Sequence, residues 1–137
     1  MTGPDGSPSA VVVVAAVVGQ GTRLLVTCRP SGVHLEGYWE FPGGKVHPGE
    51  THAEALDREM REELDAGVEV LDLILETRHE YPDRVLVLCF YRCRLLGTPR
   101  PLLGQELRWV ERDDLGSLRF PPADDLLIAR LSASDAW

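Results

Sequence analysis

The sequence predicts a single α/β domain in which a mixed β-sheet carries helices on its faces. Runs rich in valine and other β-type residues recur along the 137-residue chain, and two segments carry apolar residues at helical spacing. In chain order the elements read β-β-α-β-β-β-α, an order that favours helices packed against a mixed sheet. A chain of this length can bury a sizeable core without disulfides.

The N-terminal part contains a leader and two strands. Residues 1–9 have little to bury and are expected to form a flexible leader, which leaves 10–137 as the domain. Ala10–Val18 is rich in valine and is predicted to be a buried strand. Gly19–Thr22 then makes a tight connection to a second strand over Arg23–Cys28.

A short extended segment and a helix follow. Tyr38–Phe41 is predicted to be extended because a proline follows it. The helix is predicted from Thr51 to Asp65, with a capping box between Thr51 and Glu54 and a stop at Gly67. Its core stripe consists of apolar residues three or four positions apart: Ala53, Leu56, Met60 and Leu64.

The C-terminal half adds three strands and a helix. Val68–His79 and Val85–Leu95 are predicted strands, and the turn Tyr81–Arg84 between them predicts a hairpin. Leu107–Val110 is the last predicted strand. A pair of prolines near residue 121 opens a terminal helix. The apolar side of that helix consists of Leu126, Leu127, Ile128 and Leu131.

The composition restricts partners and location. A formal net charge of −8 argues against binding to duplex nucleic acid, although a nucleotide accompanied by metal ions is compatible with it. Val11–Val18 is too short to span a bilayer and lacks a basic flank, so no membrane partner and a cytoplasmic location are expected. Cys28, Cys89 and Cys93 are interpreted as buried free thiols. The protein is expected to be a monomer or a homodimer.

Three carboxylates gather on one side of the predicted helix. Glu59, Glu62 and Glu63 relate as i, i+3 and i+4, and like charges at this spacing repel by a few tenths of a kcal/mol, roughly. A solvated charged face is one interpretation. The segment Pro42-Gly43-Gly44, which can turn sharply and expose carbonyls, and Glu50 ahead of the helix favour another. Such oxygen-rich clusters suit Mg²⁺, with Mn²⁺ as a possible substitute.

The pattern Gly44-x5-Glu50-x7-Arg58-Glu59-Met60-x-Glu62-Glu63 resembles the Nudix box, the signature of Nudix hydrolases. The resemblance implies a Nudix-type α/β/α sandwich with a catalytic loop and helix. One departure is Asp65, which stands where the family usually has glycine. Gly67 is expected to supply the turn slightly later.

The same resemblance implies roles for individual residues. Glu59 would activate water, while Glu50 and Arg58 would brace the loop against the helix. The metal ligands would be Glu59, Glu62, Glu63 and the carbonyl of Gly43.

The resemblance extends beyond the box to the MutT branch, whose members are nucleoside triphosphate pyrophosphohydrolases, including those that destroy 8-oxo-dGTP. It spans about Val12 to Leu131, and three outer segments carry it: Trp39–Lys45, His79–Arg84 and Phe120–Asp124. Arg29 and His34 match substrate-contacting positions in a loop of the branch. Each has a simpler interpretation, as a solvated cation and as an incidental loop histidine.

Two further residues are candidates for binding substrate. Arg84 could close over the ligand or pair with Asp83. Asp124 matches an asparagine of MutT itself that meets the oxidised guanine, and an ionised aspartate is an acceptor only. It would favour an edge with donors, such as N7–H of 8-oxoguanine or the amine of cytosine. The alternative is that Asp124 only caps the terminal helix.

A second departure concerns the loop before the last strand. Branch members commonly carry a glutamate there, and this chain has Leu103, with Glu106 as the nearest acid. Either Glu106 serves by a shift of the loop, or the carboxylates of the helix suffice.

These observations predict a Mg²⁺-dependent enzyme that hydrolyses nucleoside triphosphates to nucleoside monophosphate and pyrophosphate. The expected substrate is an oxidised nucleotide such as 8-oxo-dGTP, which implies a role in sanitising the nucleotide pool. A pyrophosphohydrolase of CTP, dCTP or 5-methyl-dCTP is the alternative within the same chemistry. From another class, the alternative is a non-catalytic nucleotide-binding Nudix module. Such modules usually lose box carboxylates, whereas here all are present.

Overall fold

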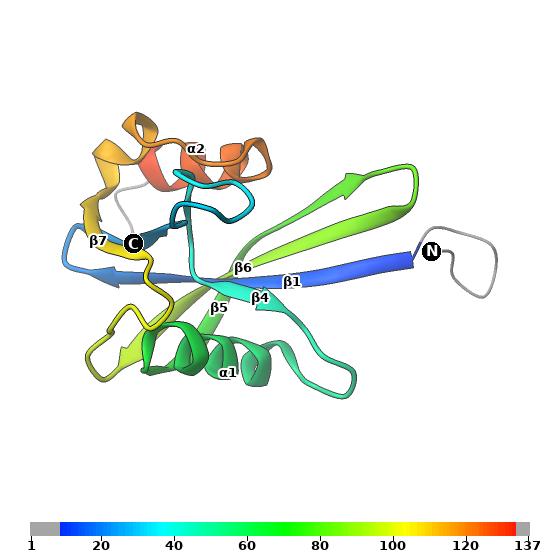
Figure 1. The fold of residues 1–137 in the computed structure, drawn as a ribbon, viewed down its shortest axis with the longest axis horizontal. Coiled ribbons are helices and arrows are strands. Elements are labelled where there is room, and N and C mark those ends of the chain that lie inside the picture. Colours follow the sequence, from blue (N-terminus) through cyan, green and yellow to red (C-terminus); the bar gives the residue numbers. More distant parts are fainter. Residues whose placement is uncertain (1–8, 134–137) are drawn as a thin grey trace.

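The computed structural model describes residues 9–133 and shows a mixed sheet with one helix on each face (Figure 1). The central strand β1 runs parallel to β6, and the other strand pairs are antiparallel. The main order is β3-β2-β1-β6-β5, while β4 pairs with β1 and β7 pairs with β2. The predicted α/β sandwich is confirmed. The strands are β1 (Ser9–Gln20), β2 (Arg23–Cys28), β3 (Trp39–Glu40), β4 (Gly43–Lys45), β5 (Gly67–Glu80), β6 (Arg84–Leu96) and β7 (Glu106–Glu111).

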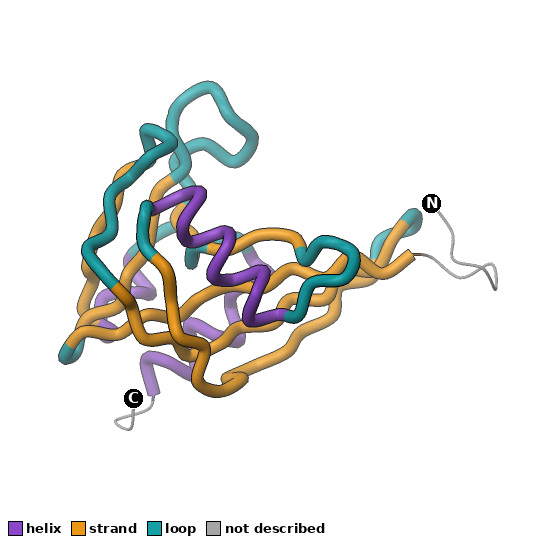
Figure 2. Tube along the Cα trace, turned by 90° about the horizontal axis from the view of Figure 1, so that it is seen from below, coloured by secondary structure: helices purple, strands orange, loops and turns teal. Residues whose placement is uncertain are grey.

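Two cores lie on opposite faces of this sheet. The helix α1 (His52–Leu64) covers one face, and α2 (Asp125–Ala133) covers the other. Figure 2 shows α1 lying across the strands from its own side of the sheet. Alternate residues of β1 enter the two cores, as the two-residue period of a strand requires. Val14, Ala16 and Val18 pack on the α1 side, whereas Ala15 and Val17 pack on the α2 side.

The first strand is longer than predicted. It begins at Ser9, so the expected leader loses its last residue, and the rest of that leader lies outside the described residues. At its other end β1 continues to Gln20, and only Gly21 and Thr22 form the turn. Gly21 has φ +62°, which glycine adopts at little cost and which a two-residue hairpin turn needs.

The segment predicted to turn sharply forms part of a strand instead. Gly43 and Gly44 belong to β4, opposite Ala15 and Val14. A Cβ on Gly43 would lie 2.0 Å from the carbonyl oxygen of Val14, so only glycine permits this close pairing. Hydrogen bonds from Ala16 N to Pro42 O and from Val46 N to Val12 O flank the pair. Gly43 therefore occupies a non-hydrogen-bonded position, and its carbonyl is directed away from β1.

The C-terminal half follows the prediction with additions. β5 and β6 form the predicted hairpin, with register shifts after Val70 and after Leu73. The terminal helix opens at Pro122 as predicted, with a short 3₁₀ helix over Pro122–Asp124 that leads into α2, whereas a 3₁₀ helix over Arg112–Ser117 was not predicted. In α2, Leu127 and Leu131 are buried, but Leu126 is 66% exposed and does not belong to the apolar side. Within residues 9–133, no helix has the length and apolar character needed to cross a membrane.

The structure of α1 confirms the predicted capping box and corrects two predictions, one on the buried side of the helix and one on its C-terminal stop. The capping box between Thr51 and Glu54 is present. Ala53 is exposed and Ala55 is buried instead, since β4 packs on the flank of the helix that carries Ala55 and Glu59. The helix ends at Asp65, which itself adopts the left-handed conformation with φ +58°, so Gly67 is not the stop. Aspartate enters this region more readily than most residues.

We expect Asp65→Ala to lower the free energy of unfolding by about 1–2 kcal/mol, because alanine keeps the left-handed strain and loses the ion pair of Asp65 with Arg100. Asp65→Gly should change the free energy of unfolding by less than about 1 kcal/mol, because the relief of backbone strain offsets the loss of an exposed ion pair. Urea unfolding followed by circular dichroism measures both variants. Equal losses in the two variants would contradict the assignment of strain.

Candidate active site

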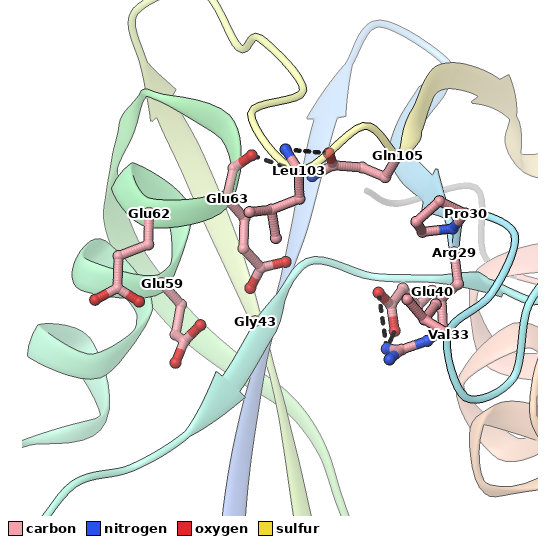
Figure 3. A pocket seen from close by; sticks show the side chains of 10 residues that line it. All are labelled: Arg29, Pro30, Val33, Glu40, Gly43, Glu59, Glu62, Glu63, Leu103 and Gln105. Atoms are coloured by element: carbon pink, nitrogen blue, oxygen red, sulfur yellow. Dashed lines mark hydrogen bonds and ion pairs between the residues drawn. The ribbon is translucent and has the colours of Figure 1, made fainter.

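The acidic side of α1 faces a pocket of about 400 Å³ that opens to solvent. Figure 3 shows the α1 carboxylates on one side of the pocket, Arg29 and Glu40 on the other, and Gly43 between them. The sequence therefore brings together residues from the helix, from β4 and from the loop after β2. The lining consists of Arg29, Pro30, Val33, Glu40, Gly43, Glu59, Glu62, Glu63, Leu103 and Gln105.

Glu50 and Arg58 form a bidentate ion pair that joins the loop to α1, as the resemblance implied. Arg58 Nε donates to Glu50 Oε2 at 2.6 Å, and Nη2 donates to Glu50 Oε1 at 2.9 Å. The hydrogen bond from Arg58, followed by one from the backbone N–H of His47, lowers the pKa of Glu50 to about 2. Glu50 also raises the pKa of Arg58 above its usual value. Both groups are therefore charged at any physiological pH.

The same guanidinium reaches two of the candidate ligands. Arg58 Nη1 donates to Glu59 Oε1 at 2.9 Å and to Glu62 Oε2 at 3.3 Å, while Nη2 also donates to the carbonyl of Lys45 at 3.0 Å. One arginine thus connects the loop, the end of β4 and two helix carboxylates. Its planar set of donors suits such a role, which a lysine could not fill.

Glu63 is partly buried, as Glu59 is, whereas Glu62 is exposed. Burial, followed by a hydrogen bond and charge from Glu59, raises the pKa of Glu63 to about 8. Near neutral pH Glu63 is therefore largely protonated, and a cation bound beside it would favour its ionised form.

The donor types fit Mg²⁺ or Mn²⁺, which prefer carboxylate and carbonyl oxygens. Glu59 lies against Gly44, where a Cβ would come within 2.5 Å of its carboxyl carbon, so glycine leaves room for this side chain. Glu62 has a 58% exposed side chain and is held by Arg58. As the described residues are arranged, no three His, Cys, Asp or Glu side chains converge as a metal site. Glu62 would have to turn from Arg58, and the ligand set remains a prediction.

A second pocket of about 260 Å³ adjoins the first and shares Arg29, Glu40 and Gly43 with it. Its walls are mainly apolar and include Phe41, whose ring stacks on Phe120 at 5.4 Å between centroids. Asp124 lines this pocket and is 8% exposed. Burial, then the charges of Glu40 and Asp125, raises the pKa of Asp124 to about 7.

Arg29 and Glu40 form the wall between the two pockets. Arg29 Nη1 lies 3.2 Å from Glu40 Oε2, and Arg29 Nε donates to the carbonyl of His34 at 2.6 Å. Burial raises the pKa of Glu40, while Arg29 opposes that shift. Sequence reasoning did not select Glu40. The available signal was its place between Trp39 and Phe41, directly before the glycine pair.

The other predicted residues lie elsewhere. The carbonyl of His34 accepts a hydrogen bond from Arg29. Among the described residues, His34 does not line either pocket. Arg84 begins β6 at the hairpin turn, 5.6 Å from the centre of the Tyr81 ring, and likewise lines neither pocket among the described residues. Glu106 begins β7, pairs with Arg108 and is not among the residues that line either pocket. Leu103 does line the first pocket.

Comparison with known proteins identifies the family. The NUDIX domain family matches residues 13–130. The chain belongs to this family. An 8-oxo-dGTP diphosphatase of Escherichia coli is 32% identical over 121 residues, which cover 88% of this chain and 94% of that protein. A CTP pyrophosphohydrolase of E. coli is 32% identical over 124 residues, covering 90% and 92% of the two chains.

Solved structures agree with this assignment. The solution structure of the E. coli ORF135 protein matches with a TM-score of 0.85 and 32% identity, covering 98% of this chain and 99% of that chain. MutT proteins are also among the matching structures. The predicted Nudix family, with its MutT-like branch, is therefore confirmed.

We expect Arg58→Lys to weaken Mn²⁺ binding by on the order of tenfold, because a lysine cannot keep the bidentate bond to Glu50 and still reach Glu59. Titration of free Mn²⁺ by electron paramagnetic resonance measures the affinity. Arg61→Lys, on the same helix and paired with Asp57 outside the pocket, is the matched control and should bind as the wild type does. Unchanged affinity in Arg58→Lys would contradict the bracing role.

Metal binding should release protons near neutral pH. Below about pH 8 part of Glu63 is protonated, and a ligand must be deprotonated, so affinity should rise as pH increases toward 8. Calorimetry of Mg²⁺ binding in two buffers with different ionisation enthalpies measures the protons released. Glu63→Gln should abolish most of this release. A release that is equally large in the variant would assign the proton to another group.

Proposed function

We propose that this protein is a Mg²⁺-dependent nucleoside triphosphate pyrophosphohydrolase that acts preferentially on oxidised nucleotides such as 8-oxo-dGTP. The products are a nucleoside monophosphate and pyrophosphate. The relatives named 8-oxo-dGTP diphosphatase support this proposal. A role in sanitising the nucleotide pool also fits the predicted cytoplasmic location.

One observation carries the proposal: an acidic pocket and an apolar pocket meet at Arg29, Glu40 and Gly43. The first suits a polyphosphate accompanied by cations, and the second suits a base. A nucleotide has the same division, with charge at one end and a flat ring at the other. Arg29 stands at the junction, where a guanidinium can bind phosphate or stack on a base.

Within this proposal the residues of the chain have defined tasks. Glu59, Glu62, Glu63 and the carbonyl of Gly43 hold Mg²⁺, which when bound neutralises phosphate charge and lowers the pKa of a coordinated water. Glu59 accepts a proton from the attacking water. Arg58 keeps Glu59 in place through the bond at 2.9 Å. The contribution of the protein is mostly positioning and charge.

Asp124 supports recognition of the base. Because its pKa is raised to about 7, the protonated form can donate to O6 of 8-oxoguanine and accept from N7–H. Unmodified guanine has an acceptor at N7 and lacks that second bond. Phe41 contributes an apolar surface to the same pocket.

A cytidine nucleotide is the second candidate substrate. Once ionised, Asp124 is an acceptor only and suits the amine of cytosine. The E. coli relative named CTP pyrophosphohydrolase supports this candidate with the same 32% identity as the E. coli 8-oxo-dGTP diphosphatase, although another relative named 8-oxo-dGTP diphosphatase is 40% identical. A non-catalytic nucleotide-binding module is less well supported, because every carboxylate of the box is in place.

Pyrophosphate release with Mg²⁺ across 8-oxo-dGTP, dGTP, dCTP, CTP and 5-methyl-dCTP tests the proposal. A kcat/KM for 8-oxo-dGTP well above that for dGTP and dCTP supports it, and a cytidine preference moves the second candidate to first place. Glu59→Gln should lower kcat by roughly 10²–10⁴-fold with folding intact. Nucleotide binding without turnover in the wild type would favour the binding module.

The choice between the two bases should depend on pH. Asp124 is protonated below about pH 7 and ionised above it, so the ratio of kcat/KM for 8-oxo-dGTP to that for dCTP should fall by up to about 100-fold between about pH 6 and about pH 8. Asp124→Asn, which keeps a donor and an acceptor without titrating, should make this ratio nearly independent of pH. A ratio that falls equally in the variant would exclude Asp124 as its cause.

A further inference from the structure

The loop between β6 and β7 is docked on the C-terminal end of α1. The amide of Arg100 donates to the carbonyl of Leu64 at 2.7 Å, and the amide of Leu102 donates to the carbonyl of Glu63 at 3.0 Å. Such carbonyls have no partner within their own helix and need one elsewhere. The loop therefore completes the end of the helix that carries the acidic cluster.

Gln105 is the buried anchor of this loop. It is 8% exposed, whereas residues 100–104 are exposed. Its Nε2 donates to the carbonyl of Glu63 at 3.1 Å, and its Oε1 accepts from the amide of Leu103 at 2.8 Å. Both ends of the amide are used, so its loss would remove the acceptor of the Leu103 amide and leave the Glu63 carbonyl with the Leu102 amide as its donor from the loop.

Both bonds of this amide end in the walls of the acidic pocket. Glu63, Leu103 and Gln105 all line it, and Figure 3 shows Leu103 beside Glu63. The second side-chain connection between loop and helix, the ion pair of Arg100 with Asp65, is solvent-exposed and involves no residue of that lining. Besides the two backbone hydrogen bonds, two side-chain connections thus join the loop to the helix, and of these two only that of Gln105 belongs to the pocket.

We propose that Gln105 is a positioning residue: by bridging the Glu63 carbonyl and the Leu103 amide, it fixes the spacing between α1 and the opposing loop and thereby the place of the Glu63 carboxylate. The inference rests on the proposed function, since it assumes that Glu63 binds the metal. Partners that orient ligands in this way commonly affect metal affinity by 10–100-fold, roughly.

Mn²⁺ binding without nucleotide, followed by electron paramagnetic resonance, tests this role together with kcat and KM. Gln105→Met keeps the volume and removes both hydrogen bonds, so Mn²⁺ affinity should fall by on the order of tenfold. The kcat should fall more than KM changes. Gln105→Asn keeps the amide, but its side chain is one methylene too short to reach both partners. Its Mn²⁺ affinity and its kcat should therefore fall as well.

Arg100→Met is the matched control, because it cuts the other side-chain connection of the same loop. It should leave Mn²⁺ affinity within about twofold of the wild type. Wild-type affinity in folded Gln105→Met overturns the proposal, and so does an equal loss in Arg100→Met or unfolding of both Gln105 variants. A wild-type protein that neither binds Mn²⁺ nor hydrolyses nucleotide overturns the proposed function as well.

Discussion

The arrangement of the site depends on the guanidinium of Arg58. It bonds Glu50 at 2.6 and 2.9 Å, Glu59 at 2.9 Å, and the carbonyl of Lys45 at 3.0 Å. These partners come from the loop, the helix and the end of β4. An exposed ion pair contributes little to stability, but a bidentate pair with several partners fixes geometry. Without it, nothing else among the described contacts ties Glu50 to the carboxylates that line the pocket.

Close backbone approach is the second constraint on the site. Gly43 must pair with β1 where a Cβ would strike the Val14 carbonyl, and Gly44 must leave space for the Glu59 carboxylate. β4 pairs with the central strand β1 and contacts α1, so the pairing of Gly43 with β1 also determines where Gly44 meets Glu59. The Gly43 carbonyl consequently points away from β1, and Gly43 lines the same pocket as Glu63 and Glu40.

The sequence predicted the parts of the fold that depend on local pattern. The capping box at Thr51, the hairpin of β5 and β6 and the central valine strand all follow from periodicity and turn chemistry. β4 was not predicted, because three residues rich in glycine carry no strand signal and form one only through tertiary pairing. The left-handed Asp65 was also missed, since the sequence offered Gly67 as a better stop.

Within the candidate site, fixed spacing on one helix predicted the acidic cluster, and the resemblance to the Nudix box implied the contact of Arg58 with Glu50. What could not be predicted is the opposite wall. Glu40, Leu103 and Gln105 enter through β3 and a loop whose docking depends on hydrogen bonds to the end of α1. No local pattern encodes those contacts. Leu103 stands where the branch commonly has a glutamate, and Glu106 pairs with Arg108. The carboxylates that line the acidic pocket therefore come from α1 and β3.

Glu40 links the two pockets electrostatically. Burial is the largest cause of the raised pKa of both Glu63 and Asp124, and the charge of Glu40 adds to each. Among the described residues lining the pockets, Arg29 is the only cation, and it is already paired with Glu40. A cation that binds beside Glu63, or a phosphate that draws Arg29 from Glu40, therefore changes the field at Asp124. Base preference and the occupancy of the acidic pocket are then not independent, and nucleotide affinities measured without the metal would describe a different protonation state of Asp124.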